Sequence, residues 1–504
     1  MINILDRVQG SALQAKIVTA EEAALLINPG DHVGISGFTP SGYPKAVPLA
    51  LAKRMESDPF QIDLWTGASV GDEADGALVR VNGIARRFPY QTNGDMRKAL
   101  NAAKVRYNDM HLSHVAQNVR YGFFGDCDVA IVEAVCIRED GGIIPSTSVG
   151  NTPTYIHKAK KVIVEVNVSQ PMSLVGMHDI YEPLDPPYRQ PLPITGPGNR
   201  VGTPYIPCDP EKIVAIVPCD ITDKTRPLAA IDDDAKAMSQ HLIEFFQNEI
   251  KHGRLPKNLL PLQSGVGSVA NAVISGLAQG PFTNLSIFTE VIQDGMFDLI
   301  DAGKVEVCSG TALSPSPDGL KRFYDNVDLY SKKIILRPQE LSNSPELARR
   351  LGVIAMNTAI EFDIFGNVNS THIMGSKMMN GIGGSGDFTR NAYISIFTCP
   401  SVAKEGKISA IVPMVSHVDH SEHDVNIIVT EQGVADLRGK SPKERAQAII
   451  ENCVHPDYKN ILWDYLKLTD GKAQTPHSMR AALAMHAELA KSGDMKNVDW
   501  AQYK

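Results

Sequence analysis

The second half of the chain repeats the order of elements in the first half, and this repetition limits the possible folds. Residues 131–151 (IVEAVCIREDGGIIPSTSVGN) and 359–376 (AIEFDIFGNVNSTHIMGS) each contain an acidic residue, a turn with glycine and a Ser/Thr–Gly segment. An apolar strand follows in each half, in KAKKVIVEVN (158–167) and AKEGKISAIVPM (403–414), and KIVAIVPCD then corresponds to DVNIIVTEQG. We predict two related open α/β domains, 1–222 and 223–504, with the functional site in the cleft between them.

Local signals agree with this α/β class. Thr19 and Glu22 form a capping box that opens a helix, and Asn28-Pro-Gly30 ends it. Helices and strands then alternate to about residue 220, which is typical of a parallel sheet. A further helix is predicted over 233–252, and the proline-rich stretch 183–210 is predicted to be an arm outside the core.

Composition excludes several classes of protein. A chain of 504 residues exceeds one ordinary core, and 43% apolar with 21% charged residues is typical of globular proteins. The net charge of −8 without a basic block argues against a nucleic-acid partner. No stretch approaches the roughly 20 apolar residues of a membrane span, and the start, MINILDRVQGSALQAK, has no targeting pattern. We therefore expect no membrane partner, a cytoplasmic location and reduced cysteines.

A glutamate stands at the end of a buried-type strand. In NLSIFTEVIQDGM (284–296), Glu290 follows the apolar run Leu285–Phe288. An ionised carboxylate there is costly unless it is paired. The chain has no G-x-S-x-G elbow and no cysteine in a nucleophile context, so Glu290 is the best candidate nucleophile. A satisfied structural carboxylate explains it equally well from the residues alone.

Gly265-Val-Gly267-Ser-Val-Ala270 fits the dinucleotide fingerprint G-x-G-x-x-G/A, and Glu290 lies about where that fingerprint places its ribose-binding acid. An NAD-dependent oxidoreductase is therefore an alternative. Against it, the preceding NLLPLQS contains Pro261 and is a poor central strand, and a long helix precedes it. The glycines still allow backbone N–H groups to approach a ligand at a helix N-terminus.

A glycine-rich stretch and a group of histidines are two further candidates for a binding site. Residues 380–387 (NGIGGSGD) hold four glycines, which favours a loop that brings N–H groups against a substrate over a flexible turn. His417, His420 and His423 lie close together, but H-x-D-H-x-x-H is not a familiar metal-ligand spacing. We expect hydrogen bonds to loops there and no metal.

Several motifs together resemble one family. SGFTPSGYPKAVP, LPLQSGVGSVANAV, FTEVIQDGM, LSNSPE, NGIGGSGDF, GKISAIVPMVSHVDH and VTEQGVADLRG are similar to motifs of the acetyl-CoA hydrolase/transferase family. These are class I CoA-transferases of the succinyl-CoA:acetate and propionyl-CoA:succinate kind. The resemblance runs from about Ala20 to Tyr458, and the last 45 residues are uninformative.

The resemblance implies a mechanism in which Glu290 attacks an acyl-CoA and then holds CoA as a glutamyl thioester until an acceptor acid reverses the steps. No general base is needed, since a glutamate with a pKa of about 4.3 is ionised at neutral pH. Backbone N–H groups of Val266 and Gly384 would hold the external oxyanion, and Asn343 the carbonyl oxygen of Glu290. The remaining positions implied to contact substrate or CoA are Gly265, Gly267, Gly383, Ser69, Glu431 and Lys404, of which Lys404 is equally well explained as a solvated surface lysine.

The resemblance further implies acyl-CoA and short-chain carboxylates as partners, coenzyme A as a substrate, no permanently bound cofactor and a homodimer. Acetate, propionate and succinate are all candidate acids. SGFTPSGYP, YGFFGD and SHVDHSEH favour the propionyl/succinyl branch. An acyl-CoA hydrolase needs the same residues, so the motifs leave that alternative open.

Overall fold

A computed structural model describes residues 4–228, 230–469, 471 and 473–504. The chain forms two compact units. Unit 1 comprises residues 1–227, 286–351 and 380–387, and unit 2 comprises 228–285, 352–379 and 388–504. Among the described residues, no helix has the length and apolar character needed to cross a bilayer. The predicted division of the sequence at 222/223 stays a prediction.

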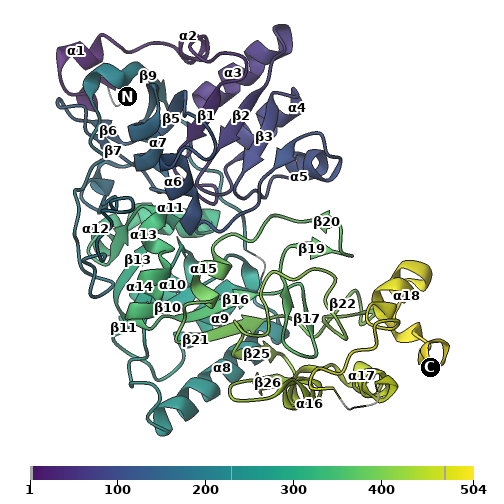
Figure 1. Cartoon of the computed structure of the whole chain (residues 1–504). Coiled ribbons are helices and arrows are strands. Elements are labelled where there is room, and N and C mark those ends of the chain that lie inside the picture. Colours follow the sequence, from purple (N-terminus) through teal and green to yellow (C-terminus); the bar gives the residue numbers. More distant parts are fainter. Residues whose placement is uncertain (1–3, 229, 470, 472) are drawn as a thin grey trace. The chain divides into compact units, whose positions relative to one another are not determined.

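Unit 1 is built on a seven-stranded sheet in which every neighbouring pair is parallel (Figure 1). Every residue of its inner strand β5 is buried, so both faces of the sheet are covered there. The strand order is β4 (Arg106–Tyr107), β3 (Ile84–Phe88), β2 (Ile62–Trp65), β1 (His32–Ile35), β5 (Val129–Ala134), β8 (Lys161–Asn167) and β9 (Ile213–Cys219). The helices of this part are α1 (Ser11–Gln14), α2 (Ala20–Ala24), α3 (Ala46–Ser57), α4 (Ala77–Arg80), α5 (Gly94–Asn101), α6 (Ser113–Arg120) and α7 (Thr152–Lys158).

Residues 286–351 also belong to unit 1 and carry Glu290. Backbone hydrogen bonds join them to the segment after β5, from Val149 N to Thr311 O (2.9 Å) and from Leu313 N to Thr147 O (2.8 Å). The strands here are β11 (Leu285–Phe288), β12 (Val291–Ile292), β13 (Val305–Gly310), β14 (Ala312–Leu313) and β15 (Ile334–Leu336). The helices are α10 (Asp294–Asp301), α11 (Pro317–Asp325), α12 (Val327–Tyr330), α13 (Gln339–Ser342) and α14 (Pro345–Leu351), and α15 (Ser385–Thr389) begins in unit 1.

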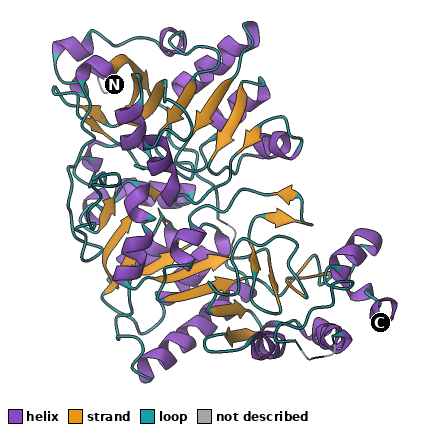
Figure 2. Ribbon diagram, viewed as in Figure 1, coloured by secondary structure: helices purple, strands orange, loops and turns teal. Residues whose placement is uncertain are grey.

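Unit 2 contains the strand order β10 (Leu262–Ser264), β16 (Ile354–Thr358), β21 (Ile394–Thr398), β25 (Ile427–Thr430) and β26 (Gly433–Asp436). The first four strands are parallel and β26 is antiparallel to β25. The α-helices of this unit, drawn in purple in Figure 2, are α8 (Asp233–Lys251), α9 (Ser268–Leu277), α16 (Pro442–Cys453), α17 (Pro456–Leu468) and α18 (Ala484–Ser492). Short strands complete the unit: β17 (Glu361–Asp363), β18 (Val368–Asn369), β19 (His372–Ile373), β20 (Lys377–Met378), β22 (Val402–Ala403), β23 (Ile408–Ser409) and β24 (Ile411–Val412).

The structure confirms the repeated order and corrects one correspondence. The parallel series β1-β5-β8-β9 of unit 1 has a counterpart in β10-β16-β21-β25 of unit 2. An antiparallel hairpin follows the second strand in each, β6 (Cys136–Ile137) with β7 (Ile143–Ile144), and β17 with β18. However, the counterpart of β8 is β21. Residues 403–414 instead form short strands, of which β24 pairs with β17. Their apolar run is too short and interrupted to serve as a sheet strand.

Local predictions from the residues also hold. Thr19 and Glu22 form both bonds of the capping box. The helix predicted over 233–252 is α8, which is capped by the Asp232 side chain and ends with His252 as its C-cap. Within the predicted arm, 183–210, residues 183–209 contain no named helix or strand, and a short 3-10 helix, Pro210–Lys212, begins at its last residue.

Candidate active site

The backbone at Glu290 is held at the end of β13. Thr289 donates its N–H to Ser309 O at 2.9 Å, and Thr311 donates its N–H to Glu290 O at 2.8 Å. The first bond is made by the residue before Glu290, and the second is accepted by the Glu290 carbonyl oxygen. They place the Glu290 side chain at the end of strand β11, where the sequence predicted an acid that needs a partner.

That partner is Asn343. Its Nδ2 donates to Glu290 Oε2 at 2.6 Å, and its Oδ1 accepts a hydrogen bond from Ser342 Oγ at 2.9 Å. Asn343 is the C-cap of α13 and is fully buried. Because both ends of the amide are used, its orientation toward Glu290 is set.

The backbone of Gly384 lies directly against the same Glu290 carboxyl group. A Cβ added to Gly384 would overlap both Glu290 Oε2 and Asn343 Nδ2, so only glycine allows the backbone to come this close. Glu290, Asn343 and Gly384 therefore meet at one point in unit 1. Gly383, beside them, has a φ of +61° and faces the Tyr90 ring.

The glycine-rich segment 380–387 is anchored to the loop 107–113 of unit 1. Ile382 donates its N–H to Asp109 Oδ1 at 2.9 Å, and Tyr107 OH donates to Asn380 O at 2.5 Å. Leu112 donates its N–H to Gly383 O at 3.3 Å. This network holds the segment in place, whereas a spacer would need no such contacts.

The electrostatics of the site differ from the expectation of an ordinary glutamate. Glu290 is partly exposed. Protein atoms replace most water around its carboxyl group and raise its pKa to about 7, while the hydrogen bond from Asn343 acts in the lowering direction. The assumption of a pKa near 4.3 is therefore wrong. Burial likewise raises the pKa of Asp387 to about 8, and the nearby Glu290 charge adds to that shift.

Ser69 lies in the loop after β2 and is buried. Its carbonyl accepts a hydrogen bond from Thr39 N at 2.8 Å. The preceding residue, Ala68, packs in one apolar cluster with Val291 and Leu112, which are neighbours of Glu290 and Ser113 in sequence. Ser69 thus belongs to the same unit as the Glu290 site, and a substrate contact for it stays a prediction.

The other predicted residues belong to unit 2. Gly265 and Gly267 form the turn between β10 and α9, Gly267 with a φ of +126°, and Val266 between them is exposed. The expectation that Pro261 weakens this strand is wrong, because β10 begins one residue after the proline and its ladder needs no N–H there. The turn therefore has the strand–glycine–helix form that presents N–H groups to a ligand.

Glu431 and Lys404 lie elsewhere in unit 2. Burial opposes ionisation of Glu431, but hydrogen bonds from Ser401 and Gln432 outweigh it and lower its pKa, so this carboxylate is charged. Lys404 lies at the exposed turn of the β22–β23 hairpin with a φ of +48°. Both positions stay predictions as substrate contacts.

Two of the three histidines have structural partners. His417 Nε2 lies 3.4 Å from Asp419 Oδ1, and its ring lies against the His372 ring at an angle of 37°. Buried His420 packs against Phe397, and His423 is exposed. Within residues 4–228, 230–469, 471 and 473–504, no group of three His, Cys, Asp or Glu side chains is arranged to hold a metal ion.

Sequence reasoning missed Asp387 and its partner Ser113. Asp387 closes the NGIGGSGD motif and could have been singled out there, because an acid after four glycines is an unusual choice. Ser113 and the loop before it carry no signal in the sequence. Their position follows only from the fold, which brings 107–113 against 380–387.

Comparison with known proteins identifies the family. The Acetyl-CoA hydrolase/transferase N-terminal domain matches residues 1–218, and the Acetyl-CoA hydrolase/transferase C-terminal domain matches residues 319–466. The chain belongs to the acetyl-CoA hydrolase/transferase family. It is 57% identical over 494 residues to the succinyl-CoA:acetate CoA-transferase of Clostridium kluyveri, covering 97% of this chain and 92% of that protein.

Other relatives carry two kinds of name. The propanoyl-CoA:succinate CoA transferase of Escherichia coli is 46% identical, covering 95% of this chain and 98% of that protein. An acetyl-CoA hydrolase of Candida glabrata is also 46% identical, covering 98% of each. Among solved structures, RipA from Yersinia pestis has the same fold with a TM-score of 0.71 at 22% identity, covering 91% of this chain and 98% of that one.

The raised pKa of Glu290 predicts a pH-dependent gain in stability for Glu290→Gln. The folded-state pKa of about 7 lies above the ordinary value of 4.5. Ionisation of Glu290 therefore costs the folded protein nothing below pH 4.5, and this cost rises with pH to about 3 kcal/mol above pH 7. Thermal unfolding midpoints at pH 8 and pH 5 test this. The variant should melt higher than the wild type at pH 8 and near it at pH 5. Equal midpoints at pH 8 would show that the carboxyl group is well hydrated.

The close approach of Gly384 predicts that Gly384→Ala inactivates the protein without unfolding it. The new methyl group must displace the Glu290 carboxyl group or the Asn343 amide, and we expect turnover to fall about 10²-fold or more. Gly439→Ala is the control, because a Cβ there meets no atom within 4 Å, although its φ of +69° carries some strain. Normal turnover in a folded Gly384→Ala variant would contradict the geometry described.

Proposed function

We propose that this chain is a CoA-transferase that moves CoA between short-chain carboxylic acids, with Glu290 as the nucleophile. The observation that carries the proposal is the contact of one carboxyl group with Asn343 Nδ2 at 2.6 Å and with the backbone at Gly384. A structural carboxylate would be fully paired. Glu290 instead keeps part of its surface exposed and has a raised pKa, as suits a reacting group.

The chemistry requires a carboxylate nucleophile. A serine or cysteine would take the acyl group as a stable ester or thioester and leave CoA free. Attack by Glu290 on an acyl-CoA instead forms a mixed anhydride and expels CoA thiolate, which then attacks the glutamyl carbonyl carbon. The first acid leaves, and CoA stays on Glu290 as a thioester. The acceptor carboxylate reverses both steps, so the thioester energy is kept.

Each step places negative charge on an oxygen, and hydrogen-bond donors must lie there. We assign Asn343 Nδ2 to the oxygen of Glu290, which it already contacts, and the backbone N–H groups of Gly384 and Val266 to the oxygen of the acyl group. Gly265, Gly267 and Gly383 allow these backbones to approach the substrate. Ser69 and Glu431 would line the acid site, and Lys404 would meet the phosphates of CoA.

The exchange pair we propose is succinyl-CoA and acetate. The sequence motifs favoured the propionyl/succinyl branch. The 57% identity to a succinyl-CoA:acetate CoA-transferase, against 46% to a propanoyl-CoA:succinate enzyme, now favours acetate as the acceptor.

Hydrolysis is the second candidate, since relatives at 44–46% identity are named acetyl-CoA hydrolases. A steady-state assay separates the two activities. Acetyl-CoA or succinyl-CoA alone should release CoA slowly, whereas adding the other acid should produce the new acyl-CoA at a much higher rate. Equal rates of CoA loss with and without an acceptor would favour the hydrolase.

The remaining features of the proposal come from the sequence. We propose acyl-CoA and short-chain acids as partners, with no nucleic acid or membrane among them, and a homodimer. We also propose two domains divided near residue 222 and a cytoplasmic location. No bound cofactor is needed for the steps above, because CoA itself is the group transferred. Sedimentation at several protein concentrations tests the homodimer.

Trapping the covalent intermediate tests the proposed function. With acyl-CoA and no acceptor acid, the enzyme should accumulate CoA on Glu290, because the second half-reaction has no partner. Hydroxylamine converts the thioester to a hydroxamate, which peptide mass mapping should place in FTEVIQDGM. Adding acetate before the quench should remove the label. Active enzyme with the label on another carboxylate, such as Glu431, would overturn the assignment of Glu290.

A further inference from the structure

A second buried carboxyl group stands behind the Glu290–Asn343 pair. Asp387 Oδ2 accepts the N–H of Ser113 at 3.0 Å and faces Asn343 Nδ2 at 3.5 Å, and its Oδ1 accepts Ser113 Oγ at 2.6 Å. All three residues are buried and belong to unit 1. Asp387 therefore joins the start of helix α6 to the amide that contacts Glu290.

The three contacts of the Asn343 amide specify which way it points. Its Nδ2 carries two hydrogens, one directed to Glu290 Oε2 and the other toward Asp387 Oδ2, while its Oδ1 accepts from Ser342 Oγ. Rotation of the amide by half a turn would place Oδ1 against the Glu290 carboxylate and remove the donor. Asp387 opposes that rotation, because its Oδ2, which already accepts the N–H of Ser113, would then face an oxygen in place of an N–H group.

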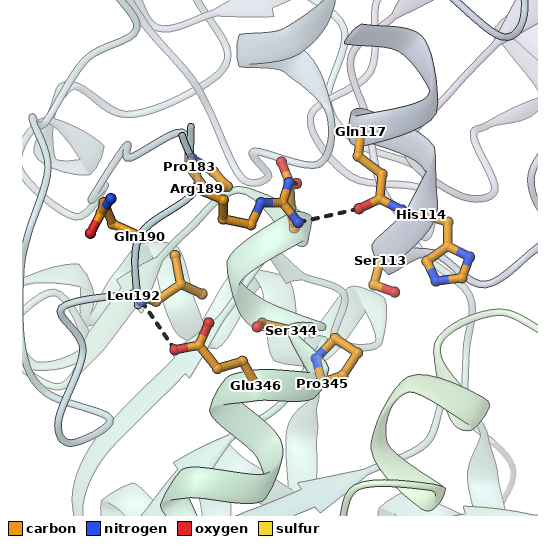
Figure 3. A pocket seen from close by; sticks show the side chains of 11 residues that line it. Ser113, His114, Gln117, Pro183, Arg189, Gln190, Leu192, Ser344, Pro345 and Glu346 are labelled. Atoms are coloured by element: carbon orange, nitrogen blue, oxygen red, sulfur yellow. Dashed lines mark hydrogen bonds and ion pairs between the residues drawn. The ribbon is translucent and has the colours of Figure 1, made fainter. Parts of the chain in front are cut away.

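Ser113, which anchors Asp387, borders empty space, whereas Asn343 itself is fully buried. Ser113 and Ser344, the residue after Asn343, both line a cavity of about 240 Å³ (Figure 3). The rest of the wall comes from α6, from the proline-rich arm and from helices α13 and α14. Arg189 Nη1 of the arm lies 3.5 Å from Gln117 Oε1 of α6. Empty space supplies no atoms for van der Waals contact, so the two hydrogen bonds to Asp387 help to hold Ser113 in place at this wall.

We propose that Asp387 is a positioning residue for the transfer reaction: anchored by Ser113, it holds the Asn343 amide with Nδ2 toward Glu290 and keeps the Gly384 backbone against the same carboxyl group. Asp387 acts through Asn343 and the 380–387 segment and need not touch the substrate. This inference rests on the proposed function, because it assigns Asp387 a part in placing the donors for the oxygen of Glu290.

A double-mutant cycle tests the inference. Asp387→Ala should lower kcat for CoA exchange about 10²-fold, as expected for the loss of one donor at a developing oxyanion, with the KM for acyl-CoA nearly unchanged. In an Asn343→Ala background the same change should cost less than about 3-fold, because residues that act through one another are not additive. Asp387→Asn should recover most of kcat, since its amide oxygen can still face Asn343 and its NH₂ can donate to Ser113 Oγ.

Asp294→Ala is the matched control. Asp294 accepts the N–H and Oγ of Ser316 at 2.6 and 2.5 Å, the same pair of bonds that Asp387 makes with Ser113, at the start of α11. Its loss should lower the unfolding midpoint and leave kcat within about 3-fold, in the range of substitutions away from a site. Circular dichroism establishes that each variant is folded.

Two results would overturn the inference. An equal cost of Asp387→Ala in the wild-type and Asn343→Ala backgrounds would show that Asp387 does not act through Asn343. A kcat for Asp387→Asn as low as that of Asp387→Ala would show that the acid itself is required. Absence of CoA exchange in the wild-type enzyme would instead contradict the proposed function, so the two failures are distinguishable.

Discussion

The hydrogen bond from Asn343 to Glu290 is the interaction on which the site depends. It supplies the Glu290 carboxyl group with one strong donor in a place where water is largely excluded. One donor is too few to return the pKa to its ordinary value, so the carboxylate stays more reactive than a fully paired one. The fold thereby leaves this carboxyl group with few hydrogen-bond donors at the point where we propose that CoA is exchanged. The protein loses stability for this as the pH rises from 4.5 to 7.

Three distant parts of the sequence build this arrangement within unit 1. The strand end at Glu290, the cap of α13 at Asn343 and the glycine segment at Gly384 meet, and Ser113 supports them through Asp387. The glycines serve close approach here, because added Cβ atoms would overlap neighbouring side chains at Gly384 and Gly386. Their density follows from how tightly the segment 380–387 lies against its neighbours.

Much of the fold could be predicted from local pattern. The capping box at Thr19, the span of α8 and the repeated strand order all depend on residues near one another in sequence, and the structure agrees. The contacts of Asp387 could not be predicted, because Ser113 is 274 residues away and has no distinguishing neighbours. The pKa of Glu290 was likewise inaccessible, since it depends on how completely the fold removes water from the carboxyl group. The sequence pattern favoured residues 403–414 as the counterpart of β8, instead of β21. Residues 403–414 have the apolar composition of a sheet strand, but their strands are too short to be one.

Transfer of oxygen to Glu290 tests the central claim most directly. In the proposed steps the acceptor acid attacks the glutamyl-CoA carbonyl carbon, and one of its oxygens stays on Glu290 when CoA leaves with the new acyl group. Turnover of succinyl-CoA with acetate labelled by oxygen-18, followed by digestion, should therefore give a heavy FTEVIQDGM peptide, with the label on Glu290 and both oxygens replaced after many cycles. Vigorous exchange of CoA with an unlabelled Glu290 would show that the carboxyl group is not the nucleophile.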